Sequence, residues 1–358
     1  MKVANTLYEG GALFKVACGI LGVSLLGACS TAEFKGTNRK NAQTPTAEPS
    51  PDPTVIPPGP TPTPGPPQCT DKQVSIGADV AFLIDNSNSN TATDCPQSKK
   101  IGTFKGTDLY ECQQATNREK AVMAAYDVLA GVAANEPGNA DALSSVAVVS
   151  FPTESNYVDG WAIKSNNGWL ETTGSTQKAL ENSLAFTRKP FGLTPYGAAM
   201  TAGNSLFSSL NAANKAKVAV LVTDGEPTDR DAVAVVEKAD ELRAKGVQVI
   251  TVYVTNGQDR SKRISDHNNM LRTFNDRSIA DGKGPWFAQR YASFDEYTRD
   301  LLGQGSSLSL AEKVSSKTDT SCQDKPGARC ERRIVEVENS SALTSVFKSI
   351  VSSAVRCE

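Results

Sequence analysis

The chain contains 358 residues, which is enough for one large domain or two domains of medium size. Its formal net charge is only −2, and its lysines and arginines form no basic stripe. A chain without such a stripe lacks the electrostatic footprint of a nucleic-acid-binding protein, so we expect no nucleic-acid partner.

The first 28 residues have the pattern of an export signal. Lys2 and Lys15 precede an apolar run at 16–26 that is too short to cross a bilayer as a permanent helix. The run ends in Leu26-Gly27-Ala28-Cys29, where a small-residue cleavage signal is followed directly by a cysteine. This pattern resembles the bacterial lipoprotein signal, which implies a signal peptide at 1–28 and a lipid anchor on Cys29. An ordinary secretory signal followed by an unrelated cysteine is the alternative.

The lipoprotein resemblance implies a lipid-anchored protein of the bacterial cell envelope, outside the cytoplasm. Ser30 follows the cysteine, and a serine at this position resembles an outer-membrane address in double-membraned bacteria. We therefore expect the outer membrane rather than the plasma membrane.

Prolines dominate the next segment, with eleven of them in the 24 residues at 44–67. Such a segment cannot build a core and favours an extended polyproline conformation, with a rise of about 3.1 Å per residue. We predict that residues 29–68 form a stalk that can hold the next domain up to ~70 Å from the membrane. A docking site for a proline-recognising module is the alternative.

From residue 69 onward, apolar runs of strand length alternate with segments of helical periodicity. Predicted strands lie at 80–84, 146–151, 218–222, 247–254 and 332–337, and predicted helices lie at 118–134, 176–187, 196–213, 231–245 and near the C-terminus. Short runs that are apolar throughout are typical of parallel strands covered on both faces. The sequence therefore predicts an α/β fold with a doubly wound, mostly parallel sheet flanked by helices on both faces.

Two less regular stretches, 90–117 and 256–331, interrupt this alternation. We interpret both as insertions, the second with one or two helices of its own. The simplest count is then a single domain at 69–358.

Six cysteines remain after Cys18, which lies in the signal, and Cys29. An even number in an exported protein favours disulfides, although six cysteines allow fifteen pairings. Closeness along the chain favours two short bridges and leaves one long one: Cys95–Cys112, Cys322–Cys330 and Cys69–Cys357.

Oxygen-bearing side chains follow two of the predicted strands. Asp85, Ser87 and Ser89 follow the strand at 80–84, and Asp224 follows the strand at 218–222. Thr194 precedes a proline at the start of a helix. Because ligands of doubly wound sheets bind beyond the carboxyl ends of the strands, we expect these loops to meet there. Such hard ligands suit Mg²⁺ or Mn²⁺, whereas simple polar turns that cap helices are the alternative.

The Asp-x-Ser-x-Ser at 85–89, the separate Thr194 and the separate Asp224 resemble the metal-ion-dependent adhesion site (MIDAS) of von Willebrand factor type A (vWA) domains. Their types, order and flanking residues match, including Thr-Pro-x-Gly-Ala and Thr-Asp-Gly-Glu-Pro, and the resemblance covers about 72–256 plus the last strand and helix. It implies that Ser87, Ser89 and Thr194 offer hydroxyls to a divalent cation. Asp85 and Asp224 would hold the cation directly or through water.

The same resemblance implies an open coordination position that takes an Asp or Glu carboxylate of a partner protein. We therefore expect an envelope lipoprotein that binds a protein ligand for adhesion or for assembly of an envelope complex. A metal-independent scaffold that uses the insertions as its contact surface is the alternative. We expect no enzyme, because no nucleophile and base pair is evident.

Six further side chains are weaker candidates. We expect His267, the only histidine, on a solvated loop or helix surface. Glu226 and Asp229 are interpreted as a plain acidic turn, with tuning of the site's rim or a second ion site as the alternatives. Trp161, Trp169 and Trp286 fit exposed anchors and packing residues equally well.

Overall fold

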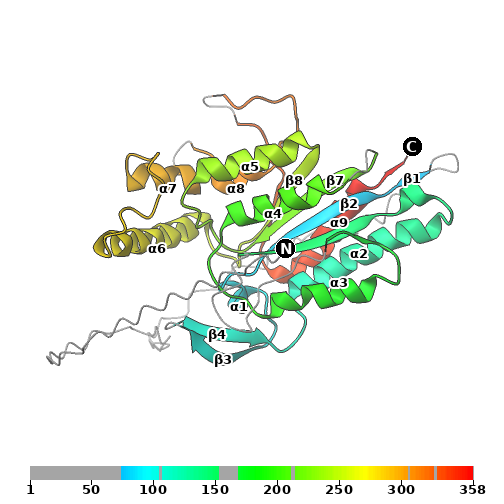
Figure 1. The fold of residues 1–358 in the computed structure, drawn as a ribbon, viewed down its shortest axis with the longest axis horizontal. Helices are drawn as coiled ribbons and strands as arrows, with labels where there is room; N and C mark the ends of the chain where they lie inside the picture. The colour runs from blue at the N-terminus through cyan, green and yellow to red at the C-terminus, as the bar shows by residue number, and fades with distance from the viewer. Residues whose placement is uncertain are drawn as a thin grey trace, which may run out of the picture. The chain divides into compact units, whose positions relative to one another are not determined.

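A six-stranded sheet forms the centre of the fold (Figure 1). The computed structural model describes residues 74–104, 107–152, 168–210, 214–304, 307–325 and 329–357, without the side chains of residues 104 and 107. The predicted signal, Cys29, the stalk and Cys69 therefore lie outside the described residues.

The strands of this sheet are β2 (Ala78–Asp85), β5 (Ser145–Phe151), β6 (Leu170–Glu171), β7 (Ala216–Thr223), β8 (Val247–Val254) and β9 (Ile334–Val337). Their spatial order is β6-β5-β2-β7-β8-β9, and every pair is parallel except β5 with β6. The prediction of a doubly wound, mostly parallel sheet is confirmed.

Strand β2 shows why its sequence is apolar throughout, since all eight of its residues are buried. Successive side chains of a strand point to opposite faces of the sheet. Val80 and Phe82 accordingly belong to the core on one face, and Ala81 and Leu83 belong to the core on the other.

Helices cover both faces of the sheet (Figure 1). The first face is covered by α2 (Asn117–Asn135), α3 (Gln177–Leu184) and α9 (Leu343–Ala354). The second face is covered by α4 (Tyr196–Ser208), α5 (Ala232–Ala244), α6 (Arg260–Ala280), α7 (Phe294–Leu302) and α8 (Leu310–Val314). Short 3₁₀ turns lie at Ala140–Ala142, Ala185–Arg188 and Ser340–Ala342. No helix in the described ranges is long and apolar enough to cross a membrane.

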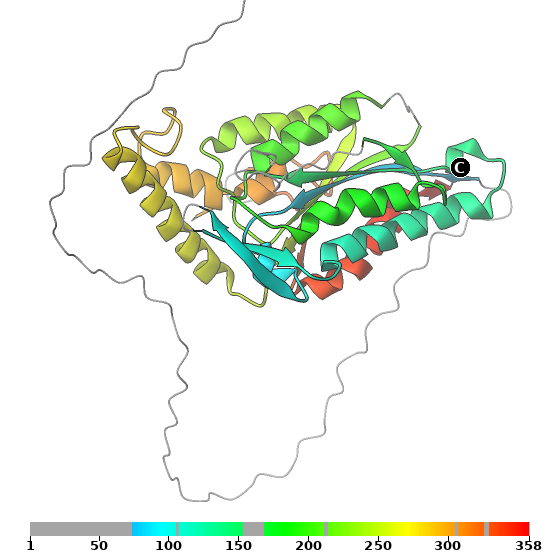
Figure 2. The same ribbon diagram turned by 60° about the horizontal axis from the view of Figure 1, so that its bottom comes forward.

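The stretch at 90–117 contains a short helix and a hairpin. Helix α1 (Asn90–Thr93) is followed by the antiparallel strands β3 (Ser98–Phe104) and β4 (Thr107–Cys112), which stand beside α1 (Figure 2). The predicted disulfide Cys95–Cys112 closes this hairpin.

The stretch at 256–331 contains α6, α7 and α8, which is one helix more than the upper end of our expectation. The five-residue α8 is too short to produce a recognisable period, but a capping box between Ser309 and Glu312 begins it. The predicted disulfide Cys322–Cys330 closes the end of this stretch.

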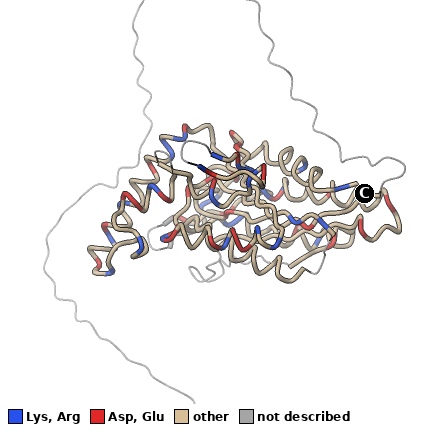
Figure 3. The backbone as a smooth tube through the Cα atoms, turned by 90° about the horizontal axis from the view of Figure 1, so that it is seen from above, with Lys and Arg blue, Asp and Glu red and all other residues tan. Residues whose placement is uncertain are grey.

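The two ends of the described chain meet in a small separate sheet, where β1 (Ser75–Ile76) pairs antiparallel with β10 (Arg356–Cys357). Cys357 is also disulfide-bonded, whereas its predicted partner lies outside the described residues. Acidic and basic residues are interspersed along the described part of the backbone (Figure 3).

Candidate metal-binding site

Asp85 joins the ends of two neighbouring strands. Its carboxylate is fully buried, and it accepts hydrogen bonds from the backbone N–H of Ser87 at 2.8 Å and from the hydroxyl of Thr223 at 2.7 Å. The parallel pairing of β2 with β7 brings these groups together, because Ile84 is in register with Val222. Burial, and then the nearby Asp224, raise the pKa of Asp85 above its usual range.

Two buried asparagines fix the loop that follows Asp85. The Asn86 side-chain amide donates to the carbonyl groups of Phe186 and Lys189, both at 3.1 Å. The Asn90 amide donates to the carbonyl groups of Asp85 at 3.0 Å and Ser87 at 3.1 Å. The sequence reasoning missed both asparagines, since a polar residue in a turn gives no sign of its distant partners.

The side chains of Ser87, Ser89 and Asp224 form a continuous hydrogen-bonded chain. The two serine oxygens lie 2.9 Å apart, and the Ser89 hydroxyl donates to Asp224 Oδ1 at 2.9 Å. The hydroxyl of Thr93, in α1, donates to the other carboxylate oxygen of Asp224. Ser87 and Asp224 are buried while Ser89 is exposed, so one side of this cluster is open to solvent.

Thr194 approaches the same cluster from a third loop. A Cβ atom added to Gly225, the residue after Asp224, would lie 2.9 Å from the Thr194 hydroxyl oxygen. Only glycine therefore permits this close approach. The loop is also held by Thr228, whose hydroxyl accepts the Thr194 N–H at 3.1 Å and whose N–H donates to the Thr194 carbonyl group at 3.0 Å.

Asp229 fixes the helix that follows Thr194. The N-cap of α4 is Pro195, which has no side-chain acceptor, so the first N–H groups need a partner from elsewhere. The Asp229 carboxylate accepts from Tyr196 N–H at 2.7 Å and from Gly197 N–H at 2.8 Å. Burial raises the pKa of Asp229 to about 6, against the effect of these two donors.

The Glu226 carboxylate also has partners among the neighbouring side chains. Its carboxylate accepts from the Tyr253 hydroxyl at 2.9 Å and lies 3.6 Å from Arg263 Nε. Asp229 and Glu226 therefore hold the structure around Asp224, which corrects the interpretation of a plain acidic turn.

A buried arginine lies behind the cluster. Arg118, in the first turn of α2, is only 1 % exposed. Its guanidinium donates to the carbonyl oxygen of Asp85 at 3.2 Å, and it lies 3.5 Å from Asp224 Oδ1 and 3.8 Å from Asp94 Oδ2. Its Nε is buried and makes no hydrogen bond with any described residue. The sequence reasoning missed this residue, because an arginine in a first helical turn usually points into solvent.

Asp94 connects the hairpin insertion to this arginine. Its carboxylate accepts the backbone N–H of Arg118 at 3.1 Å, and its carbonyl group accepts from Asn117 N–H at 3.3 Å. The chain therefore leaves and re-enters the fold at one point, so the hairpin does not displace the start of α2. Burial raises the pKa of Asp94 above its usual range.

The histidine and two of the three tryptophans are packing residues, whereas Trp161 lies outside the described residues. His267 is half-buried on α6, and its Nε2 lies 2.8 Å from the carbonyl oxygen of Pro227, which corrects the expectation of a solvated position. Trp169 stacks edge-on against Phe207. The Arg230 guanidinium lies over the Trp286 ring, 3.9 Å from the ring centroid.

The donor set fits a divalent cation. Three buried carboxylates, those of Asp85, Asp94 and Asp224, surround the single cation of Arg118, so two negative charges are left for a metal to balance. Hydroxyl and carboxylate oxygens are the ligands that Mg²⁺ and Mn²⁺ prefer. Within the described ranges, no cluster of three or more His, Cys, Asp or Glu side chains forms a metal site, so a site here would depend on the hydroxyls.

The sheet order and the position of these loops are consistent with an α/β fold of the vWA kind. Residues 144–282 match the family model VWA, the von Willebrand factor type A domain. This part of the chain is therefore similar to a vWA domain. Thr194 and Asp224 lie inside the matched range, whereas Asp85, Ser87 and Ser89 precede it and are separated from it by the hairpin insertion.

Several solved structures resemble the chain at low identity. The pilus adhesin SpaC from Lactobacillus rhamnosus GG has 12% identity and a TM-score of 0.41, covering 78% of this chain and 31% of its own. Proximal thread matrix protein 1 from the mussel byssus, with a zinc-occupied MIDAS motif, has 14% identity and a TM-score of 0.39. The match covers 80% of this chain and 49% of the byssus protein chain. The vWF domain of the pili tip protein Mfa5 from Porphyromonas gingivalis has 9% identity and a TM-score of 0.37, covering 78% and 95%.

The chain thus spans about a third of the SpaC structure and about half of the byssus protein structure. At these identities and TM-scores, the similarity is too low to indicate a shared ligand. No curated protein sequence matches the chain.

Proposed function

We propose that this protein is an adhesin-type binding module that holds a protein ligand through a divalent cation. Mg²⁺ or Mn²⁺ would be held by the hydroxyls of Ser87, Ser89 and Thr194 and by the carboxylates of Asp85 and Asp224. The observation that carries this proposal is the convergence of these groups from three loops, beside a cluster that lacks two positive charges.

The bound cation would supply a Lewis-acid contact for an Asp or Glu carboxylate of the partner protein. The exposed Ser89 marks the open side from which that carboxylate would approach. The asparagines, Asp229 and Arg118 would keep the loops in place, so the site would need little rearrangement on binding. We propose a binding role rather than catalysis, because no nucleophile and base pair accompanies the cluster among the residues that the structure describes.

The rest of the chain supports a position in the cell envelope. We propose that Cys29 carries the lipid anchor after removal of residues 1–28, and that residues 29–68 are the stalk that displays the domain. The outer membrane is the proposed location. These proposals depend on the sequence patterns at 26–30 and 44–67.

Calorimetric titration with Mg²⁺ and with Mn²⁺ tests the metal site. We expect saturable binding by the wild type, and binding at least about tenfold weaker in Asp85→Ala and in Ser89→Ala. Ser205→Ala removes an exposed hydroxyl on α4, far along the chain from these ligands, and serves as the matched control. Absence of binding by the wild type, or equal binding by Asp85→Ala, would refute the proposed metal site.

Crosslinking and mass spectrometry on cells tests the proposed mode of ligand binding. Cells carrying wild-type protein should yield a crosslinked partner that is lost with Ser89→Ala and lost when a chelator is added. A partner that survives both changes would instead support the second candidate function, the metal-independent scaffold, whose contact surface would be the β3–β4 hairpin and the stretch at 256–331.

A further inference from the structure

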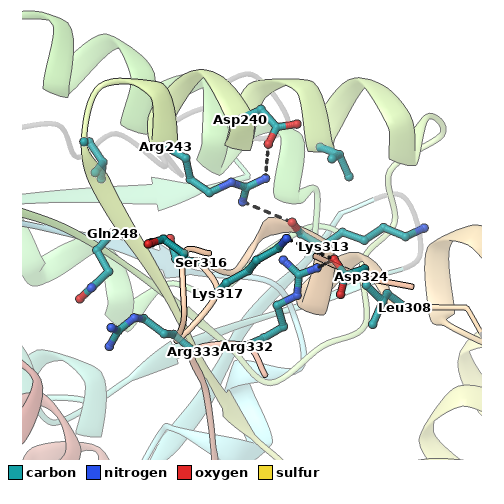
Figure 4. A pocket seen from close by; sticks show the side chains of 14 residues that line it. Asp240, Arg243, Gln248, Leu308, Lys313, Ser316, Lys317, Asp324, Arg332 and Arg333 are labelled. Carbon is teal, nitrogen blue, oxygen red and sulfur yellow. Dashed lines mark hydrogen bonds and ion pairs between the residues drawn. The ribbon is translucent and has the colours of Figure 1, made fainter. Parts of the chain in front are cut away.

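A cavity of about 640 Å³ lies at the opposite end of the sheet from Asp224. It is bounded by the last turn of α5, the first residues of β8 and the segment that follows α8 (Figure 4). Val247 in its wall is in register with Lys217, whereas Asp224 follows the far end of β7. The length of that strand separates the cavity from the proposed metal site by about 20 Å, so a separate ligand would occupy it.

The lining of this cavity is strongly cationic although the chain as a whole is slightly acidic. Five of its side chains are cationic and two are carboxylates: Arg243, Lys313, Lys317, Arg332 and Arg333, with Asp240 and Asp324. Since positive and negative charges are interspersed elsewhere (Figure 3), this excess is a local feature.

Two of the five cations have their own carboxylates. Arg243 pairs with Asp240 three residues earlier on α5 (Figure 4). It also donates to the carbonyl group of Val314 at 2.6 Å. Lys313 pairs with Asp300 of α7. These two pairs are balanced and leave no net charge.

The other three cations share a single carboxylate. Lys317 Nζ lies 3.6 Å from Asp324 Oδ2, and Arg332 pairs with the same oxygen. Arg333 lies against the neutral side-chain amide of Gln248, whose oxygen, when turned towards it, accepts from Nε and Nη2 at 3.2 Å. Among the described residues that line the cavity, two positive charges are therefore uncompensated.

Arg332 also has an unused donor. Its side chain is 12 % exposed, and its Nε is buried without a hydrogen-bond partner in the described part of the chain. An unpaired buried donor is unfavourable, and a bound acceptor that reached it would remove that cost. Ser316 and Thr320 add hydroxyl groups to the same wall.

We propose that this cavity binds a dianionic ligand, whose charge is carried by a phosphate group or by a pair of carboxylates. Two negative charges would balance the excess from Lys317, Arg332 and Arg333. The planar guanidinium groups suit oxygens presented in pairs, as phosphate and carboxylate present them. Val247 and Leu308 give the wall an apolar part that can contact the body of the ligand.

Thermal unfolding of the purified protein tests the proposal, with phosphate, malonate and chloride compared at equal ionic strength. The protein and the buffers are first freed of divalent cations on a chelating resin, and no soluble chelator is added, so that neither the proposed metal site nor a second polycarboxylate contributes to the result. We expect phosphate, malonate or both to raise the unfolding midpoint saturably, while chloride does not. A response to only one of the two identifies which group the cavity prefers.

Variants then locate the binding. Lys317→Gln and Arg333→Gln should each weaken the binding of the effective anion about tenfold in calorimetry, as expected for a lost charge-assisted hydrogen bond. Lys317→Arg keeps the cation and should retain binding. Lys262→Gln makes the same change of net charge at an exposed ion pair on α6 and should have no effect.

The proposal is wrong if neither phosphate nor malonate acts beyond chloride, or if Lys262→Gln weakens binding as much as Lys317→Gln. Unfolding midpoints in chloride show whether each variant is folded. Because metal is excluded, a negative result here leaves the proposed metal site unaffected, and a negative metal titration leaves this cavity unaffected.

Discussion

The guanidinium of Arg118 lies 3.5 Å from Oδ1 of Asp224, and both side chains are almost completely excluded from solvent. A buried ion pair of this kind gains little over an apolar pair, but it becomes costly when one partner is removed. Here the arginine also faces Asp94 and the carbonyl group of Asp85. It therefore stabilises three acidic residues that would otherwise repel each other in the absence of metal.

Replacement of Arg118 by methionine should destabilise the protein by about 3–5 kcal/mol, because Asp85, Asp94 and Asp224 lose the one buried cation that faces them within the described ranges. Urea unfolding in EDTA measures this loss. We expect added Mg²⁺ to stabilise the variant more than the wild type, since the variant has one more negative charge to balance.

Lys178→Met is the matched control for Arg118→Met, because its side chain is 77 % exposed. It should change the free energy of unfolding by no more than about 0.5 kcal/mol. A loss below about 1 kcal/mol in Arg118→Met would contradict the assigned role.

Asp229→Ala should cost about 1–2 kcal/mol, because the first N–H groups of α4 lose the acceptor that Pro195 cannot replace. The same change should weaken Mg²⁺ binding, since the Thr194 loop leads directly into this helix. Urea unfolding and calorimetry measure the two effects. Asp266→Ala, at an exposed position on α6, should change neither the stability nor Mg²⁺ binding. If both variants changed these quantities equally, Asp229 would not be the acceptor that stabilises the start of α4.

His267 should make stability fall on acidification. Burial lowers its pKa to about 4 from 6.5, so the unfolded chain takes up the proton first as the pH falls. Stability from this group is therefore complete above about pH 6.5 and is lost towards pH 4, by at most about 3 kcal/mol. The loss should be smaller than this limit, because the ring is only half-buried.

Comparison with His267→Gln isolates the histidine from the carboxylates that titrate in the same range. The glutamine amide can still donate to the carbonyl group of Pro227 but does not titrate. The difference in unfolding free energy between the two proteins should shrink as the pH falls from 7 to 4. If the unfolding free energies of the two proteins fell in parallel with pH, His267 would not contribute to the loss of stability on acidification.

Phe347→Ala should destabilise the fold by about 3–5 kcal/mol, because the cavity it leaves lies between α9 and the central strand. Its ring is fully buried and stacks on Phe82 with a centroid distance of 4.9 Å. Ser349→Ala changes an exposed residue of the same helix and should be neutral. Equal unfolding midpoints for the two variants would rule out this packing role.

The fold could be predicted because five of the six strands of the central sheet carry their own local signal, whereas the two-residue β6 is too short to carry one. Val80–Ile84 and Val218–Val222 are apolar at every position, as strands covered on both faces must be. The 13-residue α5 was equally clear, because a helix of that length repeats its apolar period several times. The five-residue α8 is barely longer than one helical turn, so its capping box is the only local signal that indicates a helix there.

The sequence by itself determined which residues stand at the carboxyl ends of β2 and β7, since Asp85 follows an apolar run directly and Asp224 follows one after a single threonine. Parallel neighbours end at one edge, so this local pattern was enough to bring them together. Only the tertiary structure decided what supports them and what lies at the other edge. Arg118, Asp229 and the cations around Asp324 meet partners that are at least seven positions away along the chain, with no periodicity, so packing alone reveals them.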